Sequence, residues 1–129
     1  MAGLREALAA GQAYRSVAEA ALAERLAHAP IDREQRAAHG FAWVATTVAS
    51  LEAVLTWCES GRDSNPLDAK IATLAFAEGI SQLVGGLPMG QNEIFRPADL
   101  GLGAAARTLA DACAGLLDAD HAAIRADVA

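Results

Sequence analysis

The sequence predicts an all-α protein, and three observations carry this prediction. Alanine makes up about a quarter of the 129 residues, and it loses no side-chain entropy when it enters a helix. Apolar residues recur at intervals of three and four along most of the chain, as on one face of a helix. Valine, isoleucine and threonine are too scattered to indicate a sheet. We therefore expect a single domain over residues 1–129, a four-helix up-and-down bundle with a long loop, containing glycine and proline, between helices three and four.

The first predicted helix covers about residues 3–28 and ends before Pro30. Gly11 falls inside the helical pattern and weakens it, so we expect the first turns to fray. The apolar side of this helix is a series at near-helical spacing: Leu4, Leu8, Val17, Ala21, Leu22 and Leu26.

The second predicted helix begins at an Asp32 N-cap, with Gln35 closing a capping box, and runs to about Ser60, before Gly61. One stripe of it is a set of apolar residues: Phe41, Val44, Val48, Leu51 and Leu55. More apolar residues lie on the adjoining side: Trp43, Val54, Trp57 and Cys58. Because it is apolar over so wide an arc, this helix is the candidate for the central element.

Two further helices follow. Asn65-Pro66 opens the third, since asparagine caps well and proline suits the first helical position. Its apolar side is Ile71, Leu74, Ile80, Leu83 and Val84, and Gly85-Gly86 ends it. The fourth helix is expected from Gly103 to about Arg125, with a core series of Leu109, Ala112, Cys113, Leu116, Leu117 and Ile124.

The segment 85–103, between the last two helices, is unusually long for a connection inside a compact domain. It contains many apolar residues, which a solvated linker would not have: Leu87, Met89, Ile94, Phe95 and Leu100. We therefore expect this loop either to fold back over one end of the bundle or to pack against another protein.

The charge of the chain and its lack of targeting signals argue against several classes of partner and location. The formal net charge is −6, and Lys70 is the only lysine. Arginines are dispersed among acids, which argues against nucleic acid as a partner and against electrostatic docking to an anionic membrane. No secretory signal is evident, and no apolar run approaches the ~20 residues that span a bilayer. We therefore expect a cytoplasmic protein with no membrane partner.

The sequence offers no complete set of catalytic or metal-binding residues. The three histidines, His28, His39 and His121, lack the spacing of a helical zinc site. Serine-nucleophile, dinucleotide-binding and phosphate-cradling motifs are missing as well. The remaining candidates have ordinary structural interpretations: Cys58 and Cys113 as small apolar residues, Glu78 as an exposed acid off the core stripe, and Glu93 with Arg96 as a local ion pair.

One segment resembles a known family. Ser81-Gln82-Leu83-Val84-Gly85-Gly86 resembles the Q-x-x-G-G segment in the C-terminal helical domain of acyl-CoA dehydrogenases. Ala69-Lys70-Ile71 is similar to the start of the same helix, although it lies about one turn closer to the glutamine than in catalytic members. In that family the glutamine and the glycine turn lie near the flavin of the neighbouring subunit. The resemblance therefore implies Gln82, Gly85 and Gly86 as cofactor-binding residues, with FAD as a possible cofactor, although the chain alone is expected to require none.

A more specific resemblance covers about residues 32–102. The runs HG-x-AW-x-AT, GG-x-PM and E-x-x-RPADLG are similar to an N-terminal helical extension in the methylsuccinyl-CoA dehydrogenase branch of that family. The chain departs from the family in lacking both a strand-rich region and the segment after Arg96 that often supplies the general base. The resemblance therefore does not carry oxidoreductase activity to the isolated chain, and no catalytic or metal residue is assigned.

Two functions remain open. The leading hypothesis is a non-catalytic interaction or oligomerisation module, which forms a homodimer or docks a dehydrogenase-like partner subunit through exposed apolar residues. The alternative is a module that binds a flavin or an acyl-CoA at the end of the third helix and contributes to an acyl-CoA dehydrogenase active site. Against the alternative, Gly85-Gly86 follows a helix C-terminus, whose dipole disfavours anions.

Overall fold

Helices dominate the computed structural model, which describes residues 2–61 and 65–129. The chain is 81% helical with one very small sheet, so the all-α class is confirmed. The elements are α1 (Ala2–His28), η1 (Ile31–Arg33), α2 (Gln35–Ser60), α3 (Pro66–Gly85), β1 (Leu87–Pro88), β2 (Ile94–Phe95), η2 (Pro97–Leu100), α4 (Gly103–Ala112), α5 (Ala114–Asp118) and α6 (Ala122–Val128).

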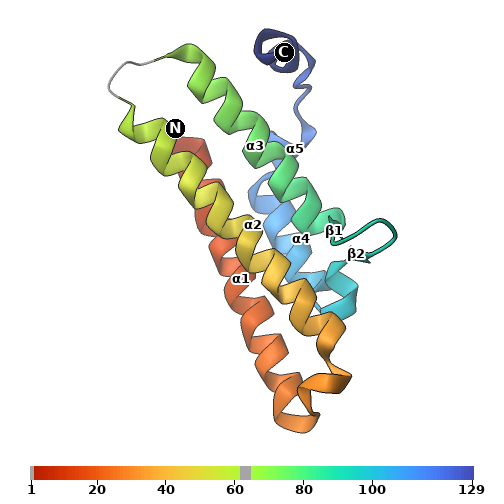
Figure 1. Cartoon of the computed structure of the whole chain (residues 1–129). Helices are drawn as coiled ribbons and strands as arrows, with labels where there is room; N and C mark the ends of the chain where they lie inside the picture. The colour runs from red at the N-terminus through yellow and green to blue at the C-terminus, as the bar shows by residue number, and fades with distance from the viewer. Residues whose placement is uncertain (1, 62–64) are drawn as a thin grey trace.

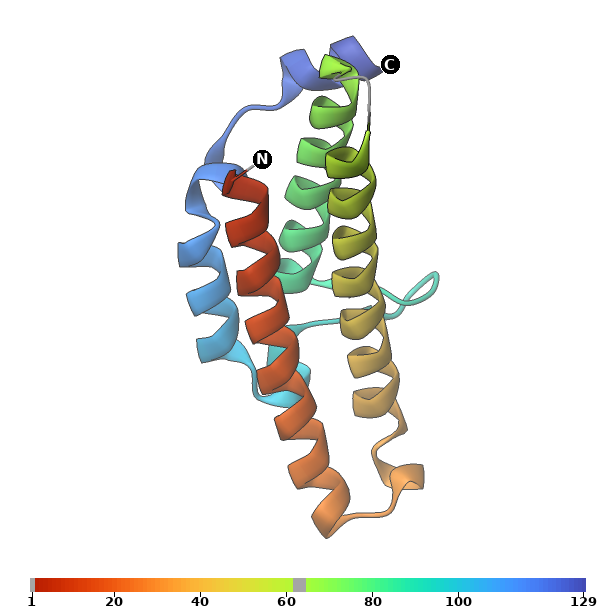
Figure 2. The same cartoon turned by 90° about the vertical axis from the view of Figure 1, so that its left-hand side faces the viewer.

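The two longest helices, α1 and α2, lie side by side, and at the end where η1 joins them they extend beyond α3 and α4 (Figures 1 and 2). The fraying expected at Gly11 is wrong, because α1 is continuous from Ala2 and Gly11 is buried in it. A Cβ at Gly11 would lie 3.8 Å from Ile80 Cδ1 and 3.9 Å from Val48 Cγ2. Packing against α2 and α3 therefore stabilises the first turns of α1 in helical conformation, although the helix propensity of glycine alone would not.

The start of α2 also differs from the prediction. The chain makes the 3₁₀ turn η1 after Pro30, and α2 begins at Gln35 with Glu34 as its N-cap. Glu34 forms no side-chain cap bond; its carboxylate instead lies 3.5 Å from Arg25 Nη1 at the end of α1. The expected Asp32–Gln35 capping box is therefore wrong, because the connection tightens into a turn that leaves Asp32 outside the helix.

The predicted start of α3 is confirmed. Asn65 Oδ1 accepts a hydrogen bond of 3.0 Å from the Leu67 N–H, and Pro66 takes the first helical position. The helix ends at Gly85, and the Gly86 N–H donates to the Gln82 carbonyl over 2.9 Å. Gly86 has a φ of +153°, which favours glycine, and a Cβ there would come within 2.6 Å of Ile94 Cγ2. Gly86 is thus required by the turn into β1, whereas Gly85 is the last residue of the helix and has open space around it.

The glycine- and proline-containing segment folds back onto the helices. β1 and β2 pair antiparallel, with Leu87 opposite Phe95. The resulting hairpin follows the end of α3 and lies beside the middle of α2 (Figures 1 and 2). Four of its apolar side chains are buried in the core: Leu87, Phe95, Leu100 and Leu102. The Phe95 ring lies against Gly40 of α2, where any Cβ would overlap the ring. The segment therefore folds back onto the helices, as the first expectation had it, although it lies beside the middle of α2 rather than over one end of the bundle.

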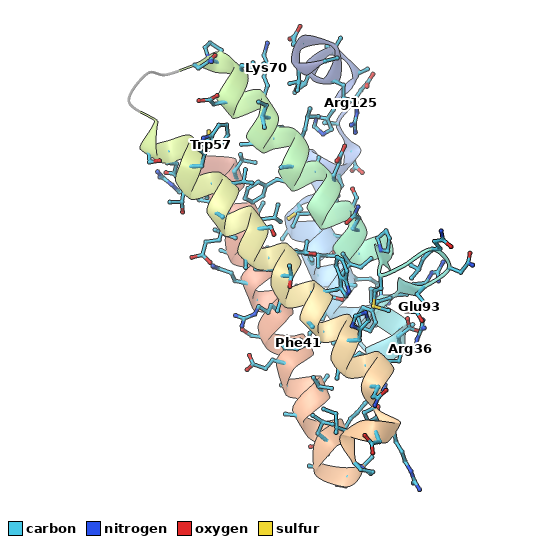
Figure 3. The ribbon with its side chains drawn as sticks, in the orientation of Figure 1. Arg36, Phe41, Trp57, Lys70, Glu93 and Arg125 are labelled. Atoms are coloured by element: carbon cyan, nitrogen blue, oxygen red, sulfur yellow. The ribbon has the colours of Figure 1, made fainter. Side chains whose placement is uncertain are left out.

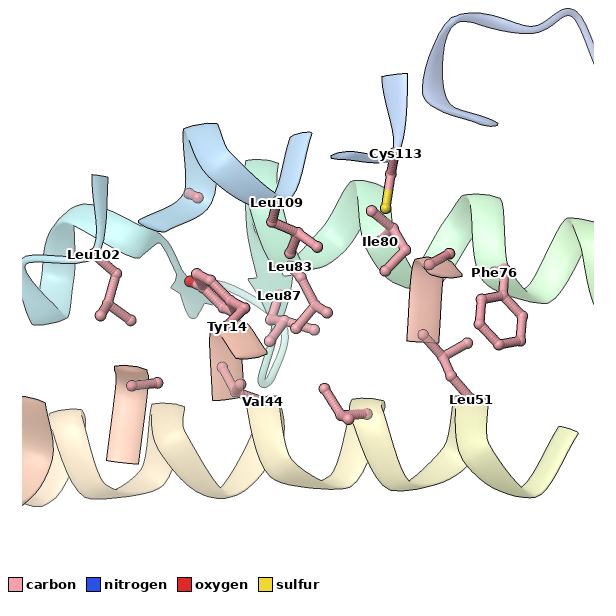
Figure 4. Close-up of a cluster of buried hydrophobic side chains, with 14 of the residues drawn as sticks. Tyr14, Val44, Leu51, Phe76, Ile80, Leu83, Leu87, Leu102, Leu109 and Cys113 are labelled. Carbon is pink, nitrogen blue, oxygen red and sulfur yellow. The ribbon is translucent and has the colours of Figure 1, made fainter. Parts of the chain in front are cut away.

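The core lies between α1, α2, α3 and α4, and its buried side chains are apolar or aromatic (Figure 4). The stripe expected on the second helix is largely confirmed, since Val44, Val48, Leu51 and Leu55 are buried. On α1 the assigned face is partly wrong: Val17 is 48% exposed and Leu26 is 37% exposed. Their places are taken by residues that the spacing of large apolar side chains did not mark: Ala7, Tyr14 and Ala18.

The predicted continuous fourth helix is wrong, because the C-terminal region forms three separate helices. Cys113 leaves helical geometry (φ −111°, ψ 19°) between α4 and α5, and Ala119 is extended. Asp120 Oδ1 then accepts from the Ala122 N–H over 2.9 Å at the start of α6. This second break turns α6 towards the start of α3 (Figure 1). There Lys70 Nζ lies 2.6 Å from Asp127 Oδ2.

Helix α2 differs from the sequence expectation in one further way. Among the described residues it is the one helix whose length and composition would allow it to cross a membrane, whereas no such segment was expected. Threonine and serine interrupt its apolar runs but lower its hydropathy only slightly. Its inner side belongs to the core, yet only 22% of its most apolar stretch is buried within the chain. The outer side of α2 is therefore uncovered, and between Arg36 and Glu52 it has no aspartate, glutamate, lysine or arginine.

Candidate functional site

The residues implied by the acyl-CoA dehydrogenase resemblance all lie at the end of α3 but face different surroundings. Gln82 is exposed and lines a cleft of about 590 Å³ between α3 and the α5–α6 region. Gly85 lines a separate cleft of about 460 Å³ beside η2 and α4. Gly86 is half-buried against the hairpin. The structure thus brings the three together along the chain without joining them in one cavity, and their cofactor role stays a prediction.

The cleft beside Gln82 contains polar groups that already have partners. Glu78 Oε1 and Arg125 Nη1 form an ion pair of 2.8 Å, and both side chains are more than half exposed. Glu78 is therefore an exposed acid, as the sequence indicated. His121 Nε2 lies 2.9 Å from the Leu116 carbonyl, and the Ser81 hydroxyl donates to the Ala77 carbonyl over 2.6 Å. Solvated and paired groups of this kind do not resemble a desolvated acid or base poised for proton transfer.

The cleft beside Gly85 is lined by two arginines, Arg96 and Arg107, among mostly apolar or small neighbours. The expected ion pair between Glu93 and Arg96 is not formed. Asp99 instead accepts a hydrogen bond of 2.8 Å from the Arg96 backbone N–H. This bond fixes the short turn into η2. Glu93, the acid that was expected to pair with Arg96, is exposed in the hairpin (Figure 3).

Arg36 connects the hairpin to α2. Its Nη2 donates to the Ile94 carbonyl over 3.0 Å and lies 3.4 Å from Asp99 Oδ2 (Figure 3). Together with the packing of the Phe95 ring on Gly40, this contact attaches β2 to the first two turns of α2. The loop is therefore a fixed part of the molecule's surface, with Ile94 left 38% exposed on it.

The histidines occupy separate positions. His28 Nδ1 lies 2.9 Å from the Glu24 carbonyl at the end of α1. On α2, the Trp43 indole N–H donates to His39 Nε2 over 3.2 Å, and the two rings meet edge-on. Within residues 2–61 and 65–129, no group of three or more histidine, cysteine, aspartate or glutamate side chains could hold a metal ion.

The ionisable groups with shifted pKa values lie away from the Gln82 cleft. The hydrogen bond from Arg5 lowers the pKa of Glu59 at the surface. Burial raises the pKa of the Cys113 thiol, and it raises the pKa of Tyr14 to about 12. The Tyr14 hydroxyl is buried and has no hydrogen-bond partner. These shifts follow from a surface ion pair and from core packing, so they mark no reactive centre.

A row of exposed side chains runs along α2, and we call it the outer stripe. Its members recur at alternating intervals of four and three: His39, Trp43, Thr46, Ser50, Ala53 and Trp57. Trp43 is 38% exposed and Trp57 is 47% exposed, which is high for the largest apolar side chain. Figure 3 labels Trp57 near the end of α2. Sequence reasoning placed the two tryptophans beside the core stripe, but the same spacing of three and four could have identified this second row.

Comparison with known proteins gives one informative match. No model of a known protein family and no solved structure matches the chain. The chain is 34% identical over 106 residues to (2S)-methylsuccinyl-CoA dehydrogenase from Cereibacter sphaeroides. The match covers 75% of this chain but only 19% of that protein, so the chain spans about a fifth of its relative's length. The resemblance indicated by the sequence motifs is confirmed, and it associates the chain with the acyl-CoA dehydrogenases.

Proposed function

We propose that the chain is a helical interaction module of, or associated with, an acyl-CoA dehydrogenase-like flavoprotein, and that it supplies contacts rather than catalysis. The module is one domain in which α1 to α4 act as an up-and-down bundle, with α5 and α6 appended to α3. The observation that carries the proposal is the match of most of this chain to a small part of a much longer dehydrogenase.

Two features of the surface support contacts over chemistry. The polar side chains of the cleft beside Gln82 have partners, either in the Glu78–Arg125 ion pair or at backbone carbonyls. In contrast, large apolar side chains are exposed on α2 and on the hairpin, notably Trp43, Trp57 and Ile94. Exposed apolar side chains that gather on one element are typical of association surfaces.

The test is to express the tagged chain in its source organism and to identify what it purifies with. We expect an acyl-CoA dehydrogenase polypeptide, either as a separate subunit or as a continuation of the same chain, and we expect the isolated chain to oxidise no methylsuccinyl-CoA with an artificial electron acceptor. Purification without any such polypeptide refutes the association. Turnover by the isolated chain refutes the non-catalytic role.

The alternative, a flavin- or acyl-CoA-binding module, is favoured by one observation: Gln82 lines a cleft between α3 and the α5–α6 region. Calorimetric titration of the chain with FAD and with an acyl-CoA tests it, with Gln82→Ala as the site variant and Gln12→Ala as a matched exposed control. Saturable binding that is lost only in the Gln82 variant would replace the proposal with this alternative.

A further inference from the structure

Helix α2 carries two rows of side chains at heptad-like spacing, on opposite sides. The inner row, Val44, Val48, Leu51 and Leu55, is buried in the core of the chain. The outer stripe has the same alternation of three and four but is exposed along its whole length. A row with this period lies on one side of a helix and is the pattern that packs against another helix. One row is covered within the chain, and the other is not.

The outer stripe is also free of acidic and basic side chains. Between Arg36 and Glu52 the helix contains no aspartate, glutamate, lysine or arginine. Glu59, further on, is paired with Arg5 of α1. The chain as a whole has a formal charge of −6, so two copies repel one another at long range. The outer stripe itself brings no like charges together when a second copy packs on it.

The two tryptophans of the stripe are placed symmetrically about Ser50. Trp43 and Trp57 lie seven residues before and after it, about 21 Å apart along the helix axis. Between them lie only small residues, Thr46, Ser50 and Ala53, which allow close approach of a second helix. An antiparallel copy with its two-fold axis at Ser50 places each Trp43 opposite the other copy's Trp57. A two-fold interface requires this kind of self-complementary pattern.

We propose that the outer stripe is a homodimer interface, in which the α2 helices of two copies pack antiparallel about a two-fold axis at Ser50. This inference rests on the proposed function as an interaction module and names the module's surface and its partner. The two tryptophans are the anchors of the interface and the small residues are its centre. Because one helical stripe is a small interface, the dissociation constant is expected on the order of 10 µM.

Sedimentation equilibrium of the purified chain tests the dimer. We expect Trp43→Ala and Trp57→Ala each to raise the dissociation constant by about 30-fold, as anchor residues do. Val17→Ala and Leu26→Ala remove comparably exposed apolar side chains from α1 and should leave it unchanged. Circular dichroism confirms that each variant keeps its helices. A chain that stays monomeric at about 1 mM, a hundredfold above the expected constant, overturns the dimer.

Disulfide trapping tests the geometry. Ser50→Cys should give a covalent dimer on mild oxidation, because only residues at the axis face their own copies within the ~4.4–6.8 Å between Cα atoms that a disulfide requires. Thr46→Cys and Ala53→Cys are matched controls, displaced from the axis by one turn on either side, and should not cross-link. The native cysteines stay in every variant, and the unmodified chain controls for them. Equal cross-linking at all three positions indicates a parallel pair and refutes the antiparallel arrangement.

Flotation with phosphatidylcholine vesicles separates a protein partner from a lipid one. A monomeric chain that floats with the vesicles, and stops floating in the tryptophan variants, assigns the stripe to a lipid surface and overturns the proposal. The failure of the dimer is distinguishable from the failure of the proposed function, because co-purification of a dehydrogenase polypeptide does not depend on self-association.

Discussion

Tyr14 offers the sharpest test of the packing described above. It is the chain's single tyrosine, it is 3% exposed, and its hydroxyl has no hydrogen-bond partner. A buried donor without a partner costs about 1–3 kcal/mol relative to one solvated in the unfolded chain. Tyr14→Phe removes the hydroxyl and keeps the ring, so we expect it to stabilise the fold by about 1 kcal/mol and to raise Tm by about 4 °C.

The pH dependence of the same residue gives a second measure of its burial. Because burial raises the pKa of Tyr14 from 10.0 to about 12, the folded chain holds this proton more tightly than the unfolded chain does. The stability linked to Tyr14 is therefore complete below about pH 10 and falls as the pH rises towards 12. At about 1.4 kcal/mol for each pKa unit, the loss is at most about 3 kcal/mol.

The assay is urea denaturation of the wild type and of Tyr14→Phe from pH 7 to 12, read by circular dichroism. Tyrosinate absorbance of the folded wild type reports Tyr14 alone, since no other tyrosine is present. Phe76→Tyr, which adds a hydroxyl to a fully buried ring, is the converse control and should destabilise. A Tyr14→Phe chain that is less stable by 1 kcal/mol or more, or a folded titration midpoint near 10, would refute the reasoning.

Three further contacts are tested by substitution, each by thermal and urea denaturation. Gly40→Ala should destabilise by about 2–3 kcal/mol because its Cβ would overlap the Phe95 ring, whereas Gly85→Ala, with open space around it, should change stability by less than about 0.5 kcal/mol; equal effects would contradict the close packing of the hairpin on α2. Asn65→Ala should cost about 1 kcal/mol through loss of the bond to the Leu67 N–H, and an unchanged stability would show that the cap is not formed. Glu78→Gln should cost less than about 1 kcal/mol, since the ion pair with Arg125 is more than half exposed on both sides; a larger loss would mean that this cleft is less solvated than described.

Features fixed by local chemistry were predictable from the sequence. Asn65 caps the helix with its own side chain, and Pro66 and Gly86 act through their own backbone, so the start and the end of α3 follow from residue type. The break between α4 and α5 has no comparable signal, because Cys113 and its neighbours are compatible with a continuous helix. That break and the turn at Asp120 depend on the docking of α6 against α3, which is a tertiary effect.

The inner face of α1 was partly misjudged for a related reason. In an alanine-rich helix the small residues can form the contact surface, so the large ones do not mark it; Ala7 and Ala18 are buried while Val17 is exposed. The role of Gly40 was equally hidden, since it depends on a phenylalanine 55 residues further along the chain. Of the candidate site, the position of Gln82 at the end of α3 was predictable, but its separation from Gly85 by the course of the hairpin was not.

The inner side of α2 packs in the core of the chain, and its outer side is the surface that we propose for association. Its inner row packs large aliphatic side chains into the core, and its first turns hold the hairpin through Arg36 and Gly40. None of these contacts uses Trp43 or Trp57, so truncating either tryptophan should weaken association without loosening the core. If the tryptophans had a purely structural role, truncating either one would lower the stability of the fold together with the self-association. If Trp57→Ala lowered stability as much as it lowered self-association, the outer stripe would belong to the fold of the single chain, and the proposed interface would have to lie elsewhere.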